Sequence, residues 1–246
     1  MGALGERRAA VLRAVVSDYI RTGGPIGSAS LASRYRLGVS AATIRNDMAA
    51  LEELGFLRQP HTSSGRAPTD RGYRFYVDAI PSTQAPPSRW RPSIARYFGQ
   101  PPRDPDEVIR GAALLLSRIT RYGAVAQPPL SAHVVVMGTA NIVGEEGFER
   151  RETVRGLLEV LEEERDVLEL LRRLVAGSHV VVQIGAENPI SALREASIVA
   201  APYGAGDRPL GAIAVLGPTR MHYRESISTV RSVAEHLGRT IERLAG

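Results

Sequence analysis

The sequence of 246 residues contains no cysteine, no lysine and few aromatic side chains. Without cysteine it can form no disulfide framework, thiol nucleophile, iron–sulfur cluster or cysteine-based zinc site. Its five histidines are scattered, and no two of them have the spacing of a metal-binding pair. No apolar run approaches the roughly 18 residues that a membrane span requires. Because Arg13 interrupts the apolar run behind Arg7 and Arg8, we expect no signal peptide and a cytoplasmic protein.

Catalytic motifs are missing as well. The sequence has no Gly-x-Ser-x-Gly elbow, no His-Glu-x-x-His and no Walker loop. Gly204-Ala205-Gly206 is followed by Asp207-Arg208-Pro209, which breaks a dinucleotide fingerprint and is more typical of a hairpin turn. We therefore expect neither enzymatic activity nor a cofactor.

All 31 basic residues are arginine, and they are unevenly distributed. Residues 1–103 carry 15 arginines against 7 acidic residues (+8), whereas residues 104–246 carry 16 against 19 (−3). The exclusive use of arginine favours either phosphate binding throughout or, more simply, a coding bias. The asymmetry predicts a polyanion-binding module at the N-terminal end, joined to a nearly neutral second part.

Three helices are predicted in the first 55 residues. Apolar residues recur at helical spacing in the first, which ends at Gly23-Gly24-Pro25: Leu12, Val15, Val16, Tyr19 and Ile20. Ser28 can cap a short second helix. After a tight turn at residues 36–39, Ser40 can cap a third, which ends near Leu54.

The third helix presents two different faces. Ile44, Met48 and Leu51 form a core stripe, and the opposite side carries Asn46 between two small residues, Ala42 and Ala49, with Thr43 and Arg45 on its flanks. Small residues permit close approach to a groove, and Asn and Arg can bind adenine and guanine edges through two hydrogen bonds. For this helix alone, an ordinary solvated face is the alternative.

A hairpin is predicted after the third helix. Residues 56–60 and 73–77 are β-prone, and the polar loop of residues 61–72 between them is rich in hydroxyl and guanidinium groups. Three helices and a hairpin make a winged helix-turn-helix, with a loop suited to phosphates or the minor groove. We expect DNA contacts from Ser40, Ala42, Thr43, Arg45, Asn46, Arg58, His61, Thr62, Ser63, Ser64, Arg66, Arg71 and Arg74.

These residues also carry a family resemblance. The stretch VSAATIRNDMAALEELGFLRQPHTSSGRAPTDRGYRFYVD at residues 39–78 resembles the N-terminal domain of the HrcA family of bacterial heat-inducible transcription repressors. The match extends back to residues 19–23 and 25–28. The resemblance implies a homodimer that binds CIRCE, an inverted-repeat operator in double-stranded DNA upstream of chaperone operons. It also implies release on heat stress and a GroE-type chaperonin that maintains binding competence.

Residues 79–105 contain seven prolines and no predicted core stripe, so we interpret them as a semi-rigid linker between residues 1–78 and 106–246. The four arginines of this segment either follow DNA phosphates or, as we prefer, keep it solvated.

The second part alternates helices and strands. Helical spacing appears in residues 108–119, 149–175 and 225–244, and strand-like runs occupy residues 133–137, 179–185, 197–203 and 210–217. We therefore predict an α+β class, with helices on an antiparallel sheet. The acidic cluster Glu162-Glu163-Glu164 with Asp166 is interpreted as a solvated helix face rather than a metal site.

The second part resembles the GAF-like C-terminal domain of the same family, through residues 184–188, 197–199 and 217–221. His222 stands where the family pattern has Asp. Family members are typically longer. Because the helix ending near Tyr122 runs almost directly into residues 130–142, the resemblance implies that this chain skips part of the family's sheet and its inserted dimerisation segment. The apolar stripe of residues 154–171 offers a substitute dimer interface, although an intramolecular core is the simpler use.

Two other functions stay open. The GAF-like domain of a regulator can sense a small-molecule effector, and a winged helix can serve protein–protein contacts without binding DNA.

Overall fold

A computed structural model describes residues 4–62, 64–101, 104–129, 133–144, 148, 151–174, 177, 179–204 and 209–245. The chain divides into two compact units, Met1–Ile80 and Pro81–Gly246, which are described separately. Among the described residues, no helix is long and apolar enough to cross a membrane.

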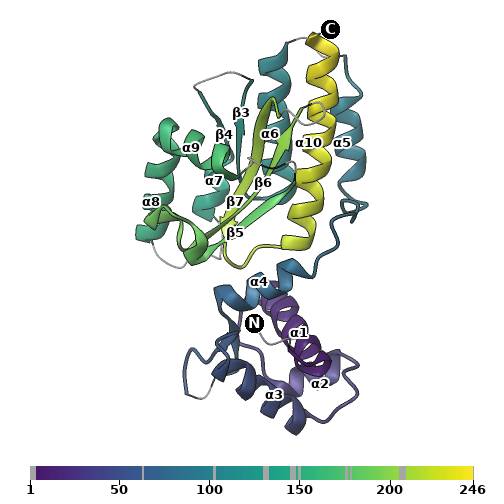
Figure 1. The fold of residues 1–246 in the computed structure, drawn as a ribbon, viewed down its shortest axis with the longest axis vertical. Coiled ribbons are helices and arrows are strands. Elements are labelled where there is room, and N and C mark those ends of the chain that lie inside the picture. Colours follow the sequence, from purple (N-terminus) through teal and green to yellow (C-terminus); the bar gives the residue numbers. More distant parts are fainter. Residues whose placement is uncertain are drawn as a thin grey trace. The chain divides into compact units, whose positions relative to one another are not determined.

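In the described residues of the first unit, four helices (Figure 1) accompany a short two-stranded sheet. In chain order these are α1 (Glu6–Thr22), α2 (Ser28–Arg34), α3 (Ala41–Glu53), β1 (Leu57–Arg58), β2 (Ala67–Pro68) and α4 (Asp70–Asp78). Helix α1 ends as predicted at Gly23, which adopts a positive φ of 73° and donates its N–H to the Tyr19 carbonyl.

The core of the first unit lies between α1, α3 and α4. In the predicted stripe of α1, Leu12, Val15, Val16 and Ile20 are buried and Tyr19 is half-buried. In α3, Ile44 and Leu51 are fully buried. The 3.6-residue periodicity of these two helices therefore identified their core faces correctly.

The predicted second strand of the hairpin, residues 73–77, is wrong. These residues belong to α4, whose first turn is capped by Thr69: its Oγ1 accepts the Gly72 N–H at 3.2 Å. Tyr73 and Val77 are buried four residues apart, at helical spacing. Strand β2 comes earlier, with Leu57 facing Pro68 in antiparallel register.

The segment before β2 is held close to the chain ahead of α2. Ile26 and Arg66 exchange two backbone hydrogen bonds of 2.9 Å. A Cβ at Gly65 would lie 2.4 Å from the Ile26 carbonyl oxygen, so only glycine allows this approach.

Within the part of the second unit that the structure describes, five strands form an antiparallel sheet with the order β4-β3-β7-β6-β5. Its strands are β3 (Gly123–Gln127), β4 (Val135–Met137), β5 (Val181–Ile184), β6 (Ala196–Tyr203) and β7 (Gly211–Pro218). Its helices are α5 (Arg91–Phe98), α6 (Pro105–Thr120), α7 (Thr139–Gly144), α8 (Arg151–Glu162), α9 (Glu164–Leu174) and α10 (Tyr223–Ala245), with two short 3-10 turns, Gly185–Glu187 and Ser191–Leu193. The α+β class is thus present.

Helices cover both faces of this sheet (Figure 1). Helices α6 and α10 pack on one face, and α5 packs on these two helices. The other face carries α7, α8 and α9, where Leu157, Leu161 and Leu171 join Ile198 and Leu216 in one buried cluster. The stripe of residues 154–171 is therefore an intramolecular core, as preferred.

Three expectations for the second unit need correction. Residues 91–98 of the predicted linker form α5, with Ile94 buried. The single helix expected over residues 149–175 is two helices that meet at Glu163, because an acidic first turn favours a new helix start at Glu164. Strand β3 was not predicted at all. The acidic cluster itself is exposed, as a solvated face should be.

Candidate nucleic-acid interface

Helix α3 exposes the side that the sequence predicted. Ala42, Arg45 and Asn46 are exposed, and Ala49 is half-buried. Ile44 and Met48 on the opposite side are buried. The exposed face of α3 thus consists of small side chains, from which only the Asn46 amide and the Arg45 guanidinium project among these four residues.

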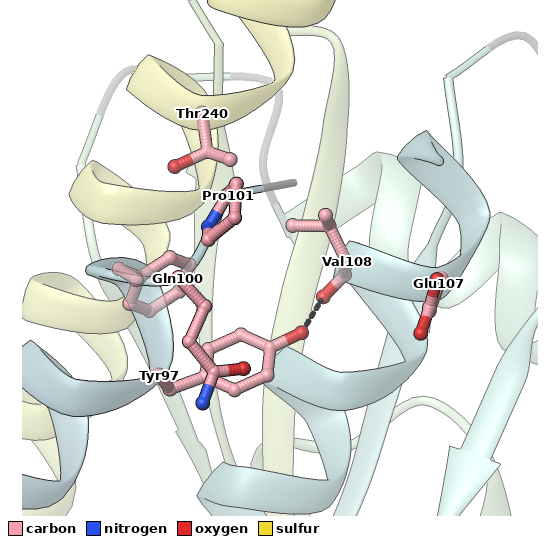
Figure 2. Close-up of a pocket in the computed structure, with 7 residues that line it drawn as sticks. Tyr97, Gln100, Pro101, Glu107, Val108 and Thr240 are labelled. Atoms are coloured by element: carbon pink, nitrogen blue, oxygen red, sulfur yellow. Dashed lines mark hydrogen bonds between the residues drawn. The ribbon is translucent and has the colours of Figure 1, made fainter. Parts of the chain in front are cut away.

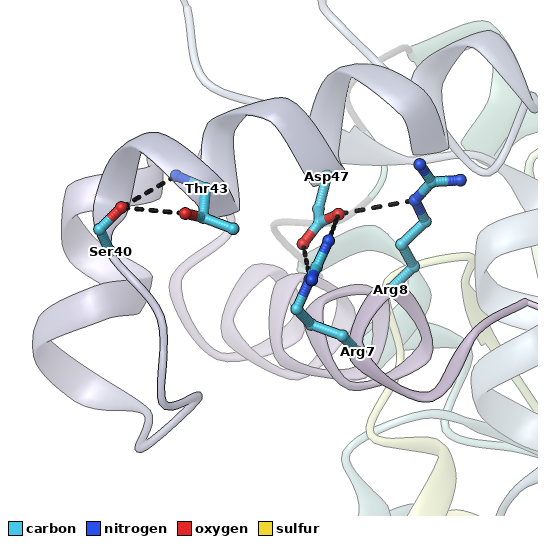
Figure 3. Close-up of polar contacts among 5 residues, drawn as sticks. All are labelled: Arg7, Arg8, Ser40, Thr43 and Asp47. Atoms are coloured by element: carbon cyan, nitrogen blue, oxygen red, sulfur yellow. Dashed lines mark hydrogen bonds and ion pairs between the residues drawn. The ribbon is translucent and has the colours of Figure 1, made fainter.

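The N-terminal end of α3 is fixed by Ser40. Its Oγ accepts the Thr43 N–H at 3.2 Å and lies 3.0 Å from Thr43 Oγ1 (Figure 3). The predicted cap is confirmed. Both hydroxyls are therefore positioned at the end of α3 by each other and by the backbone.

A carboxylate beside the exposed face binds two arginines of α1 (Figure 3). Asp47 is 3% exposed; Arg7 Nε lies 2.8 Å from its Oδ2, Arg7 Nη2 lies 3.1 Å from Oδ1, and Arg8 Nε lies 3.5 Å from Oδ1. The hydrogen bonds from Arg7 hold the pKa of the Asp47 carboxyl below its ordinary value, against the opposing effect of burial. The ion pair fixes α3 to α1.

A second buried carboxylate has the same arrangement. Asp18 of α1 is 1% exposed and accepts hydrogen bonds from Arg21 at 2.6 Å and from Arg34 of α2 at 2.7 Å. Together, Asp18 and Asp47 connect α1 to both of the helices that follow it.

The loop between β1 and β2 is only partly available for contacts. Arg58 at the end of β1 is exposed, as are His61 and Thr62 in the loop. Ser64, by contrast, donates its hydroxyl to the His61 carbonyl at 2.7 Å and accepts the His61 N–H at 2.9 Å, so it shapes the loop. Ser63 lies outside the described residues.

The other three arginines that were predicted to contact DNA make contacts within the first unit. Arg66 Nε lies 2.8 Å from the Glu52 carboxylate, and Arg66 is among the more buried arginines of the unit, with 20% of its side chain exposed. Arg71 donates to the Leu54 carbonyl at 2.7 Å, with its guanidinium 4.3 Å from the centre of the Phe56 ring. Arg74 lies 3.4 Å from Asp78. These side chains stabilise the hairpin and α4, which sequence reasoning did not foresee.

The second unit contains a cavity of about 400 Å³ next to α5, α6 and α10 (Figure 2). Tyr97 lines it and donates its hydroxyl to the Val108 carbonyl at 2.7 Å. Burial, with a smaller effect from the Glu107 carboxylate, raises the pKa of Tyr97 to about 12. The phenol is thus neutral and already hydrogen-bonded. Among the described lining residues, Gln100 and Glu107 also bring polar side chains to the cavity, and the Thr240 hydroxyl accepts a hydrogen bond from Arg243.

Sequence reasoning missed Arg7, Arg8 and Asp47. Asp47 lies 40 positions after Arg7 and 39 after Arg8. A lone aspartate on a helix gives no local signal of an ion pair with residues so far away in the sequence. Asp47 does fall beside the predicted core stripe at Ile44, Met48 and Leu51, which could have marked it as a charge near the interior.

Comparisons with known proteins point to one family, by a match to part of the chain and by matches over nearly all of it. A family model, the HrcA protein C terminal domain, matches residues 129–227. A heat-inducible transcription repressor HrcA from Thermobifida fusca is 32% identical over 97% of both chains, and one from a Nocardioides species is 32% identical over 96% of this chain and 98% of its own. The first alignment extends over 334 positions although this chain has 246 residues, so a substantial part of that relative has no counterpart here.

Similarity to a solved structure extends to the fold. The crystal structure of a hypothetical protein superposes with a TM-score of 0.86 over 98% of this chain and 99% of its own, at 21% identity.

Proposed function

Because the chain belongs to the HrcA family of heat-inducible transcription repressors, we propose that it represses transcription by binding DNA through its first unit, as a winged helix-turn-helix protein does. In this assignment α2 and α3 form the helix-turn-helix, α3 enters the major groove, and the loop after β1 is the wing. Arg45 and Asn46 read bases, and Ser40 and Thr43 contact the backbone or bases at the helix end.

The observation that carries this proposal is the exposed face of α3. Asn46 is exposed between Ala42, which is exposed, and Ala49, which is half-buried, so no large side chain keeps the helix away from a groove. An Asn–adenine or Arg–guanine pair with two hydrogen bonds discriminates against the wrong base by roughly 1–3 kcal/mol. In the wing, Arg58, His61 and Thr62 are exposed and suited to backbone or minor-groove contacts. Ser63, Ser64, Arg66, Arg71 and Arg74 are assigned supporting contacts at most.

The proposed target is the CIRCE inverted repeat upstream of chaperone operons. An inverted repeat presents two half-sites related by a two-fold axis, so the active form is a homodimer. We assign the second unit as a GAF-like domain that carries out dimerisation and regulation. Since the stripe of α8 and α9 is buried against the sheet of its own unit, dimerisation uses another surface.

Heat acts, in this proposal, on the integrity of the second unit. If warming unfolds the second unit, the first units of the two protomers are no longer linked. The protein then loses the ability to bind both half-sites of the repeat at once. A GroE-type chaperonin that refolds this unit would restore repression.

A small-molecule effector is the second candidate function, and the cavity next to α5, α6 and α10 favours it. An effector at 100 times its Kd would stabilise the protein by about 2.7 kcal/mol. A thermal-shift screen of metabolites therefore tests this candidate, and Q100A with E107A would remove the shift if the effector occupies the cavity.

The proposed function is tested by titrating the protein onto three duplexes at fixed salt: the inverted repeat, a single half-site and a scrambled sequence. We expect the repeat to bind two protomers, with an affinity roughly 10³-fold or more above that for the scrambled duplex. Equal affinities for the three duplexes would contradict sequence-specific repression and would leave only the electrostatic attraction of a basic unit.

A further inference from the structure

Two arginines lie beside the reading face, the exposed side of α3 that carries Ala42, Arg45, Asn46 and Ala49, but are not part of it. Arg7 and Arg8 come from the first turns of α1 and both contact Asp47, the residue that follows Asn46 on α3 (Figure 3). Asp47 also lies four positions from Thr43, which places this cluster on the Thr43 flank of the exposed face of α3.

The cluster has one buried negative charge and two partly exposed positive charges. The Asp47 side chain is 3% exposed, whereas those of Arg7 and Arg8 are 56% and 45% exposed. Asp47 therefore holds the guanidiniums in place from the inside, and the excess positive charge faces solvent. Arg7 engages the carboxylate through Nε and Nη2, which leaves its Nη1 group pointing away from the pair.

A helix that lies in the major groove has a row of phosphates along each of its flanks. We infer that Arg7 and Arg8 form a site for DNA backbone phosphates at the edge of the groove, with Asp47 as the positioning residue that orients both guanidiniums. The inference rests on the proposed function, and it adds a contact surface on α1 to the reading face and the wing. Guanidiniums held in a fixed geometry suit this role, because an arginine binds phosphate oxygens through two parallel hydrogen bonds.

The alternative is that the cluster only fixes α1 to α3. The two roles differ in the salt dependence of DNA binding, since each phosphate contact adds about 0.9 to the slope of log affinity against log salt concentration. A purely structural ion pair contributes nothing to that slope.

The test compares R7Q/R8Q/D47N with R13Q in the full-length protein. Both variants lower the net charge by one, but Arg13 is exposed on another side of α1 and has no ion pair among the described residues. The triple variant also removes the buried carboxylate, so no unpaired charge stays inside the unit. Affinity for the inverted repeat is measured between 50 and 200 mM salt, and far-UV circular dichroism confirms that each variant is folded.

We expect the triple variant to reduce the magnitude of the slope by about 1.8, so that its affinity falls roughly tenfold less than that of the wild type over this salt range. R13Q should keep the wild-type slope, and R7K/R8K should keep it too, because the charges remain. R7Q, which leaves Arg8 at Asp47, should lose about 0.9 and serves if the triple variant does not fold.

The outcomes separate the inference from the proposed function. A wild type that prefers the repeat, together with a triple variant and R7Q that keep its slope, would overturn the phosphate site alone. A wild type with no preference for the repeat would contradict the proposed function instead.

Discussion

Asp47→Asn gives a direct test of how α3 is held. The substitution keeps the shape of the side chain but removes the charge that two arginines bind. Hydrogen bonds to charged groups contribute roughly 1.5–3 kcal/mol, and the exposed arginines can be hydrated once released. We therefore expect the first unit to lose about 2 kcal/mol of stability at pH 7.

The assay is urea unfolding of the full chain with two signals. Circular dichroism follows the helices of both units, and the fluorescence of Trp90, the single tryptophan, follows the second unit, to which it belongs. The free energy of unfolding of a small protein falls by roughly 1–3 kcal/mol per M urea. A loss of about 2 kcal/mol should therefore lower the urea concentration at the unfolding midpoint of the first unit by roughly 1 M. The Trp90 transition should not move.

The stabilisation by the Asp47 ion pair should depend on pH in a definite direction. Arg7 lowers the pKa of Asp47 in the folded state below the ordinary value of 3.8, so the stabilisation is complete above about pH 4 and is lost as the pH falls through the folded-state pKa. The difference between wild type and D47N should therefore shrink below pH 4. A difference that is absent at pH 7, or that grows on acidification, would refute the account of this ion pair.

Three further predictions concern the cap, the core and the cavity. S40A should cost the first unit about 1 kcal/mol, because α3 loses its cap, and S40D should restore most of it in the same urea assay; equal stability of all three proteins would contradict the cap. L157A should cost the second unit about 2–5 kcal/mol in the Trp90 transition, since Leu157 is fully buried in the core of that unit; an unchanged Trp90 transition would contradict this place in the core. Because burial raises the pKa of Tyr97 to about 12, the wild type should lose stability between pH 10 and 12 as the unfolded tyrosine ionises, and Y97F should lose less over that interval; parallel pH profiles would rule out this role for Tyr97.

The sequence predicted those elements whose signals are local. The stripes of α1 and α3, the Ser40 cap and the runs that became β5, β6 and β7 all appear where periodicity and capping residues indicated them. The exposure of Arg45 and Asn46 also followed from their position opposite Ile44 and Met48.

The errors occurred where local signals conflicted or were absent. Tyr73, Phe75 and Val77 have strand propensity, but the Thr69 cap and the burial of Tyr73 and Val77 at helical spacing favour α4. Residues 123–127 read Gly-Ala-Val-Ala-Gln, a short run with no polar–apolar alternation. They form a strand because β7 and β4 pair with them on either side. Ion pairs such as that of Arg7 with Asp47 join residues 40 positions apart, which periodicity cannot detect.

The central claim is that α3 reads DNA bases through Arg45 and Asn46, and the double variant R45A/N46A tests it most directly. Its affinities for the inverted repeat and for a scrambled duplex are measured beside those of the wild type at one salt concentration. Base reading predicts that the preference for the repeat falls by about 1–3 kcal/mol per residue, while binding to the scrambled duplex changes far less. A double variant that keeps the wild-type preference would contradict the account.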